Sequence, residues 1–288
     1  MSGYWAGVIA ILCINVLLSY SVFVTAAAGQ LNLGAAGFMA IGAVGAALAS
    51  SEVGLPLAAS IAIGAAATAL VGFLISFPVL RTRGVYMVLA TFAFAEFLSG
   101  VMLAFPRFGG ATGLVVAEHV GLAWLLPITI AATLAVFYLM STRLGLAMRS
   151  IHDDELVSTV MGVNVRAVQV AAFTIGGALA GLGGALYAHH YNFIEAPYFN
   201  ALLSIYVLLF VLIGGTQTAW GPLVGASFFT IVPELLRLGG SSWRYVIFGC
   251  LIVLMMIWRP EGLVTRTLIA RLSLLKWLAP KRKVAADG

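Results

Sequence analysis

Long apolar stretches, separated by short polar segments, run through most of the chain. Most of them approach the length of about 20 residues that a helix needs to cross a hydrocarbon core of about 30 Å. Because unpaired backbone groups are not tolerated in lipid, we interpret these stretches as helices and not as strands. The nine stretches cover residues 4–28, 34–50, 55–80, 85–105, 121–140, 168–188, 201–214, 221–238 and 245–258.

Two of these stretches are poor candidates for a complete membrane span. Segment 201–214 is short, and segment 34–50 is crowded with Gly and Ala. We therefore predict an all-α, polytopic membrane protein with about eight transmembrane helices, together with broken or re-entrant segments.

The composition of the chain supports this interpretation. Hydrophobic residues make up 62% of the sequence, the mean hydropathy is +1.08, and charged residues make up 9%, against roughly 25% in soluble domains. The net charge of +5 does not indicate a nucleic-acid-binding protein, because the basic residues are divided among separate segments. The expected environment is therefore the lipid bilayer, and no nucleic acid is expected as a partner.

The basic residues also predict an orientation, because short loops rich in Lys and Arg stay in the cytoplasm. Twelve of the 15 basic residues fall in three segments of the chain. An even number of apolar stretches separates each segment from the next, so all three segments can lie on the same side of the membrane. This places the N-terminus outside and the C-terminus in the cytoplasm. The twelve are Arg81, Arg83, Arg143, Arg149, Arg166, Arg259, Arg266, Arg271, Lys276, Lys281, Arg282 and Lys283.

Several kinds of chemistry have no motif in this sequence. A phosphate-binding loop of the form G-x-x-x-x-G-K-[ST] is absent, so any ATP must be bound by another chain. The adjacent His189 and His190 have no carboxylate or Cys companions nearby, and neighbouring helical residues point to different faces. We therefore expect no ATP-binding site and no metal site in this chain.

Three polar residues inside the apolar stretches are candidates for a functional role. Glu96 lies near the middle of 85–105, and Gln30 and Asn32 lie in a glycine-rich break before 34–50. Buried polar groups at membrane depth are costly unless they are paired or line a cavity. Each of the three therefore either lines a translocation path or fixes helix packing by hydrogen bonds, and the sequence leaves both roles open.

The polar segment 141–166 interrupts the apolar pattern most strongly. Asp153, Asp154 and Glu155 would favour the N-terminus of a short helix, and Gly162 would suit its C-terminal end in the left-handed conformation. An ordinary solvated loop is the alternative. The tail 265–288 shows a basic amphipathic pattern suited to a membrane surface, so we divide the chain into a transmembrane domain, 1–264, and this cytoplasmic tail.

Six blocks, in this order, resemble the permeases of ABC importers for branched-chain amino acids, of the LivM type. The resemblance covers nearly the whole chain, to about Val264. The blocks are GQLNLGAAGFMAIGA at 29–43, LRTRGVYMVLATFAFAE at 80–96, GLAMRSIHDDELVSTVMGVNV at 145–165, GALAGLGGALYA at 177–188, IGGTQTAWGPLVGA at 213–226 and WRPEGL at 258–263.

The resemblance implies a non-enzymatic, multi-pass subunit in the bacterial inner membrane, with no catalytic residue and no cofactor in this chain. Its implied partners are a second homologous permease, two cytoplasmic ATPase subunits that bind the ATP, and a periplasmic or extracellular substrate-binding protein. The loop 141–166 would hold the coupling helix that docks on an ATPase. Its general Glu-Ala-Ala motif is replaced here by Leu156, Val157 and Ser158. The implied coupling residues are Arg149, Asp153, Asp154, Glu155 and Gly162.

The substrate is the least defined part of this hypothesis. Branched-chain amino acids are expected, but similar permeases carry urea, short amides or aromatic acids. The alternative from another class is a secondary transporter of a small organic solute that uses Glu96 to couple transport to protons.

Overall fold

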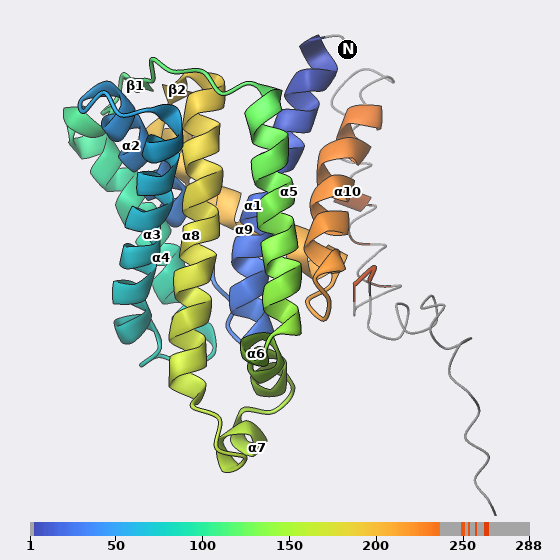
Figure 1. Cartoon of the computed structure of the whole chain (residues 1–288). Coiled ribbons are helices and arrows are strands. Elements are labelled where there is room, and N and C mark those ends of the chain that lie inside the picture. The colour runs from blue at the N-terminus through green and yellow to red at the C-terminus, as the bar shows by residue number, and fades with distance from the viewer. Residues whose placement is uncertain (1–2, 237–248, 251–252, 254–256, 258–261, 265–288) are drawn as a thin grey trace, which may run out of the picture.

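The structure is a computed structural model that describes residues 3–236, 249–250, 253, 257 and 262–264. In this part of the chain the predicted all-α architecture is confirmed (Figure 1). The last apolar stretch, 245–258, lies almost wholly outside the described residues, and the tail 265–288 lies outside them. The α-helices are α1 (Gly3–Ala27), α2 (Ala35–Ser51), α3 (Leu57–Val79), α4 (Val85–Ala104), α5 (Leu122–Ser141), α6 (Arg143–Asp153), α7 (Glu155–Val160), α8 (Val165–Tyr191), α9 (Ala201–Gly214) and α10 (Trp220–Leu236).

Five of these helices, α1, α3, α4, α5 and α8, are long and apolar enough to cross a membrane. The apolar helices α2 and α9 are shorter, with 17 and 14 residues. These are the two segments that the sequence marked as too short or too crowded to span. The total of about eight spans stays a prediction, because the described residues do not include the whole chain.

Helix α8 packs against α1, α2 and α3, and glycines allow the close approach. A Cβ on Gly42 of α2 would collide with the backbone of Gly181 of α8. A Cβ on Gly64 of α3 would lie 2.6 Å from the Gly42 carbonyl oxygen. Small residues let backbones meet in this way, and van der Waals packing then holds the helices together. The glycine-rich stretches thus form tight helix crossings.

The two ends of the bundle differ in charge. At one end, β1 (Leu114–Val115) pairs antiparallel with β2 (Phe193–Ile194), and α1 starts at the same end (Figure 1). Beside α4, the 3-10 helix η1 (Pro106–Phe108) carries Arg107, whose guanidinium donates to both carboxylate oxygens of Glu52 and lowers the pKa of that carboxyl. The opposite end, where α6 and α7 lie, carries Arg81, Arg83, Arg143, Arg149 and Arg166.

Candidate functional site

The polar loop 141–166 folds into two helices, and the second has the capping geometry that its sequence predicts. Asp154 is the N-cap of α7, and its carboxylate accepts hydrogen bonds from the N–H groups of Leu156 (2.9 Å) and Val157 (3.0 Å). Glu155 occupies the first turn, where a negative charge is favourable. Gly162 has φ +83°, the left-handed conformation that glycine adopts without strain. The short helix is therefore confirmed.

One detail of the prediction is wrong. Asp153 was expected at the N-terminus of the short helix, but it is the last residue of α6. The backbone changes to an extended conformation at Asp154 and begins a new helix there, so Asp153 belongs to a different helix from Glu155.

The apolar surface of α7 was not predicted, because the prediction for this loop rested on its charged residues. Leu156 and Met161 are each 79% exposed and Val160 is 86% exposed, with Val157 beside them. Leu156 and Val160 are four residues apart and so share one face of the helix. An apolar cluster this exposed on so short a helix is typical of a surface that another protein covers. The sequence feature that could have indicated this surface is the group of apolar residues in LVSTVM at 156–161.

Helix α6 anchors α7 to the bundle. Its residues Met148 and Ile151 are buried in the hydrophobic core, and a ring nitrogen of His152 lies 3.0 Å from the carbonyl oxygen of Ala26 at the end of α1. Arg149, on the same helix, is half-buried. A force on α7 would therefore reach α1 and α5 through a packed helix and not through a loose loop.

A second group of polar residues lies in the middle of the bundle, where α9 begins. The side chain of Glu96, about midway along α4, accepts a hydrogen bond of 2.8 Å from the N–H of Ala201, the first residue of α9. Asn200 caps the same helix by accepting from the N–H of Leu203 (3.1 Å). A carboxylate at a helix N-terminus stabilises the free N–H groups there. The 3-10 helix η2 (Ala196–Phe199) leads directly into this site.

The start of α2 lies close to the same place. The N–H of Leu33 donates to the hydroxyl of Thr91 on α4 (3.0 Å), and the N–H of Ala36 donates to Ser204 on α9 (2.9 Å). Asn32 accepts from the N–H of Gly34 (2.7 Å). Side chains thus satisfy the backbone of the break before α2, as a non-helical segment at membrane depth requires. Two helices therefore begin inside the bundle, both next to α4.

The Glu96 side chain is exposed on the surface of this chain in spite of its hydrogen bond. It shares an exposed face of α4 with Leu89, Ala93, Phe97 and Gly100, which recur at helical spacing. Contact between a carboxylate and lipid costs several kcal/mol at the bilayer centre. This face of α4 therefore needs a protein or a water-filled path beside it.

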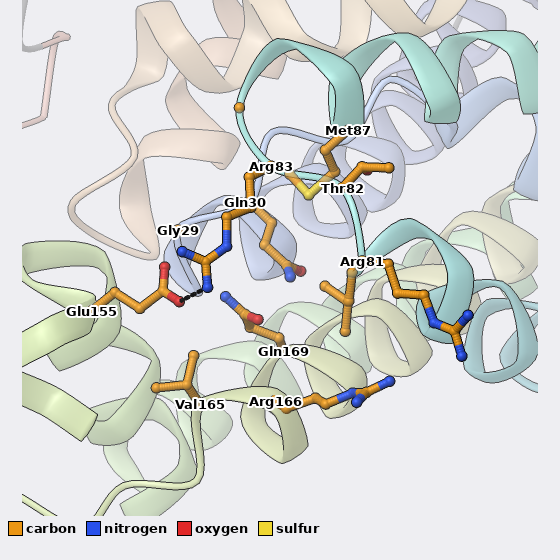
Figure 2. A pocket seen from close by; sticks show the side chains of 12 residues that line it. Gly29, Gln30, Arg81, Thr82, Arg83, Met87, Glu155, Val165, Arg166 and Gln169 are labelled. Carbon is orange, nitrogen blue, oxygen red and sulfur yellow. Dashed lines mark ion pairs between the residues drawn. The ribbon is translucent and has the colours of Figure 1, made fainter. Parts of the chain in front are cut away.

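A cavity of about 540 Å³ lies at the α7 end of the bundle (Figure 2). Figure 2 shows the amides of Gln30 and Gln169 and the guanidinium of Arg83 directed into one space. The Arg83 Nη2 lies 3.9 Å from the Glu155 Oε1, and both side chains are solvent-accessible, so the pair contributes at most about 1 kcal/mol. The cavity brings together two of the predicted site residues, Gln30 and Glu155, and leaves Asn32 and Glu96 apart from them.

Comparison with known proteins assigns this chain to a family. The model of the family described as branched-chain amino acid transport system / permease component matches residues 4–256. The chain belongs to this family. It is accordingly a multi-pass membrane permease, as its apolar helices indicate.

Relatives of this permease carry names from two kinds of transport system, one for branched-chain amino acids and one for nucleosides. LivM of Escherichia coli (strain K12), a high-affinity branched-chain amino acid permease protein, is 29% identical over an alignment that covers 83% of this chain and 64% of the relative. LivH of the same organism is 26% identical over 48% of this chain and 46% of its own length. The nucleoside permease protein NupC of Lactococcus lactis is 29% identical over 39% of this chain and 35% of its own length.

The chain thus spans less than two thirds of the length of its LivM relatives. No solved structure matches it. What this permease carries and which subunits it assembles with are therefore matters for proposal.

Proposed function

We propose that this permease is a subunit of an ABC importer and carries branched-chain or related amino acids across the bacterial inner membrane. The observation that carries the proposal is the family match across residues 4–256. The chain itself is proposed to have no enzymatic activity and no cofactor, with ATP bound by separate subunits. The NupC similarity is a reason to assign the choice of substrate to the binding protein, so urea, short amides and aromatic acids remain alternatives within the family.

The proposed partners are two ATPase subunits in the cytoplasm, a second homologous permease, and a substrate-binding protein on the other side. Five arginines gather at the α7 end, which we assign to the cytoplasm because basic loops stay there. The start of α1 lies at the other end, so the N-terminus would be outside (Figure 1). The C-terminus is expected in the cytoplasm.

Helix α7 is the proposed coupling helix. Its exposed apolar face supports docking in a groove of an ATPase, and the burial of α6 supports transmission of the movement into the bundle. Arg149, Asp153, Asp154, Glu155 and Gly162 are the coupling residues expected from the sequence. The capping geometry suggests that Asp154 and Gly162 act by shaping α7.

The proposed translocation path runs along the exposed face of α4. Helix α9 begins at Glu96 on this face and α2 begins next to the buried side of α4, and discontinuous helices at membrane depth are a recurring feature of transport sites. The second permease would cover this face, so that Glu96 meets protein or water and not lipid. Gln30 would line the route at the α7 end, and Asn32 would hold the break before α2.

Reconstitution tests the proposed function against the proton-coupled alternative. In proteoliposomes that hold the complete set of subunits, leucine uptake should require the binding protein and ATP. Uptake should fall to background without the ATPases, with or without a proton gradient. Proton-driven uptake by the permease alone, abolished by Glu96→Gln, would instead establish the secondary transporter.

The cap of α7 provides a test at a single residue. Asp154→Ala removes the N-cap, which is worth about 1 kcal/mol, and should weaken co-purification with the ATPase subunits about five-fold. Asp154→Asn keeps a capping side chain without the charge, so it should bind within about two-fold of the parent protein. Equal losses for both variants would mean that the charge, and not the cap, is what the ATPase requires.

A further inference from the structure

The cavity of Figure 2 carries an excess of positive charge. Arg81, Arg83 and Arg166 line it, together with one acidic residue, Glu155. Arg83 lies near Glu155, whereas Arg81 and Arg166 form no ion pair with any residue that the structure describes. Figure 2 shows the side chains of Arg81 and Arg166 extending to the same side of the cavity, away from Glu155. The site is thus built to receive an anion.

Gln30 independently indicates a missing ligand. Its side chain is only 2% exposed and lines this cavity, yet neither its Nε2 nor its Oε1 finds a hydrogen-bond partner in the described part of the chain. A buried amide without partners costs about 1–3 kcal/mol. A ligand with acceptor oxygens would satisfy the Nε2 group.

An apolar groove of about 580 Å³ adjoins the cavity, and Arg166 lines both. Phe73 and Phe77 of α3 form one wall of the groove. The other wall is the outer side of α8, where Val170, Ala171, Thr174 and Ile175 lie. At 1.5 Å per residue, the groove extends about 12 Å along α8 from Arg166 to Thr174. It therefore leads from a basic site toward the middle of the bundle.

The position of the arginines decides what kind of anion fits. Arg81 follows the end of α3, and Arg166 is the second residue of α8. Both helices are long enough to cross a membrane, so these two residues lie at the level of the lipid headgroups. Basic pockets between transmembrane helices at this level suit anionic headgroups. A free anion would use the arginines and Gln30 but would leave the groove empty.

We infer that this site binds an anionic phospholipid. Its phosphate lies between Arg81 and Arg166, its polar headgroup extends into the cavity that Gln30 lines, and one acyl chain lies in the groove between α3 and α8. The bound lipid ties the start of α8 to the end of α3, next to the helix α7 that is linked to the cavity through Glu155.

Native mass spectrometry of the delipidated, full-length permease in complex with its partner subunits tests this inference. Added dioleoylphosphatidylglycerol should bind at least about five-fold more tightly than dioleoylphosphatidylcholine. Arg81→Gln and Arg166→Gln should each weaken the binding of phosphatidylglycerol about five-fold, since one basic residue near a membrane surface contributes about 1 kcal/mol. Arg166→Lys should retain most of the binding. The matched control is Arg143→Gln, an exposed arginine that does not line the cavity and should change nothing.

A separate variant tests whether an acyl chain lies in the groove. Ala171→Phe fills it without touching the arginines, and should weaken the binding of phosphatidylglycerol as much as the loss of one arginine does. Glycerol 3-phosphate, the headgroup without chains, should fail to displace the lipid at equal concentration. Displacement by glycerol 3-phosphate, or unchanged lipid binding in Ala171→Phe, would show a free-phosphate site. Equal affinity for the two phospholipids, or equal effects of Arg166→Gln and Arg143→Gln, would overturn the inference.

Discussion

Replacing Leu156 and Val160 together with serine should lower the affinity of the permease for its ATPase subunits at least ~30-fold. The two side chains share one face of α7 and are 79% and 86% exposed. The few residues that dominate a protein interface lie near its centre and are each worth about 2 kcal/mol or more, and we expect this pair to take that role on α7. Co-purification of the subunits and ATP-driven uptake in proteoliposomes should fall together.

The exposure of these residues makes the result interpretable. Substitutions on an exposed surface usually change stability by less than about 0.5 kcal/mol, so the double variant should fold and reach the membrane. Val115→Ser is the matched control, because Val115 is also apolar and 70% exposed but lies in β1 at the other end of the bundle. If the double variant bound the ATPases as tightly as this control does, α7 would not be the docking helix.

Much of the fold follows from the apolar pattern alone. Every apolar stretch from 4–28 to 221–238 coincides with a helix, and the ends differ by only a few residues. The reason is physical: lipid requires each crossing segment to satisfy its own backbone, so length and hydrophobicity largely determine the element. Local chemistry also identified the ends of α7, because Asp154 and Gly162 act within one turn of their own position.

The arrangement around Glu96 could not be derived in the same way. Its hydrogen-bond partner, Ala201, is 105 residues away in the chain, and no local pattern links the two. The sequence likewise gave no reason to separate Asp153 from Asp154, because acidic residues at a helix end and at a helix start look alike in composition. Where two helices cross, the residues in contact depend on how each helix is rotated about its axis and on how deep it lies in the membrane. The periodicity of apolar residues along the sequence determines neither.

The close crossing of α2 and α8 leads to the second large effect. Gly184→Ala should destabilise the permease by about 1–3 kcal/mol or more, because overpacking forces the surrounding structure to move. A Cβ at this position of α8 would collide with the carbonyl oxygen of Met39 on α2, and would meet the backbone of Ala43 at 3.0 Å. No rotamer change can relieve a contact with backbone atoms, so the two helices must separate. The melting temperature of the purified permease complex in detergent should fall, and so should its yield.

Gly183 provides the control within the same helix. A Cβ there would meet the side chains of Leu17 and Leu18 at 3.5–3.7 Å, which is ordinary van der Waals contact. Because alanine favours a helix over glycine by roughly 1 kcal/mol, Gly183→Ala should leave the melting temperature unchanged or raise it. Opposite effects of one methyl group at adjacent positions would separate the crossing of α2 and α8 from any general need for glycine in α8. Equal melting temperatures would mean that these two backbones do not meet as closely as the structure describes.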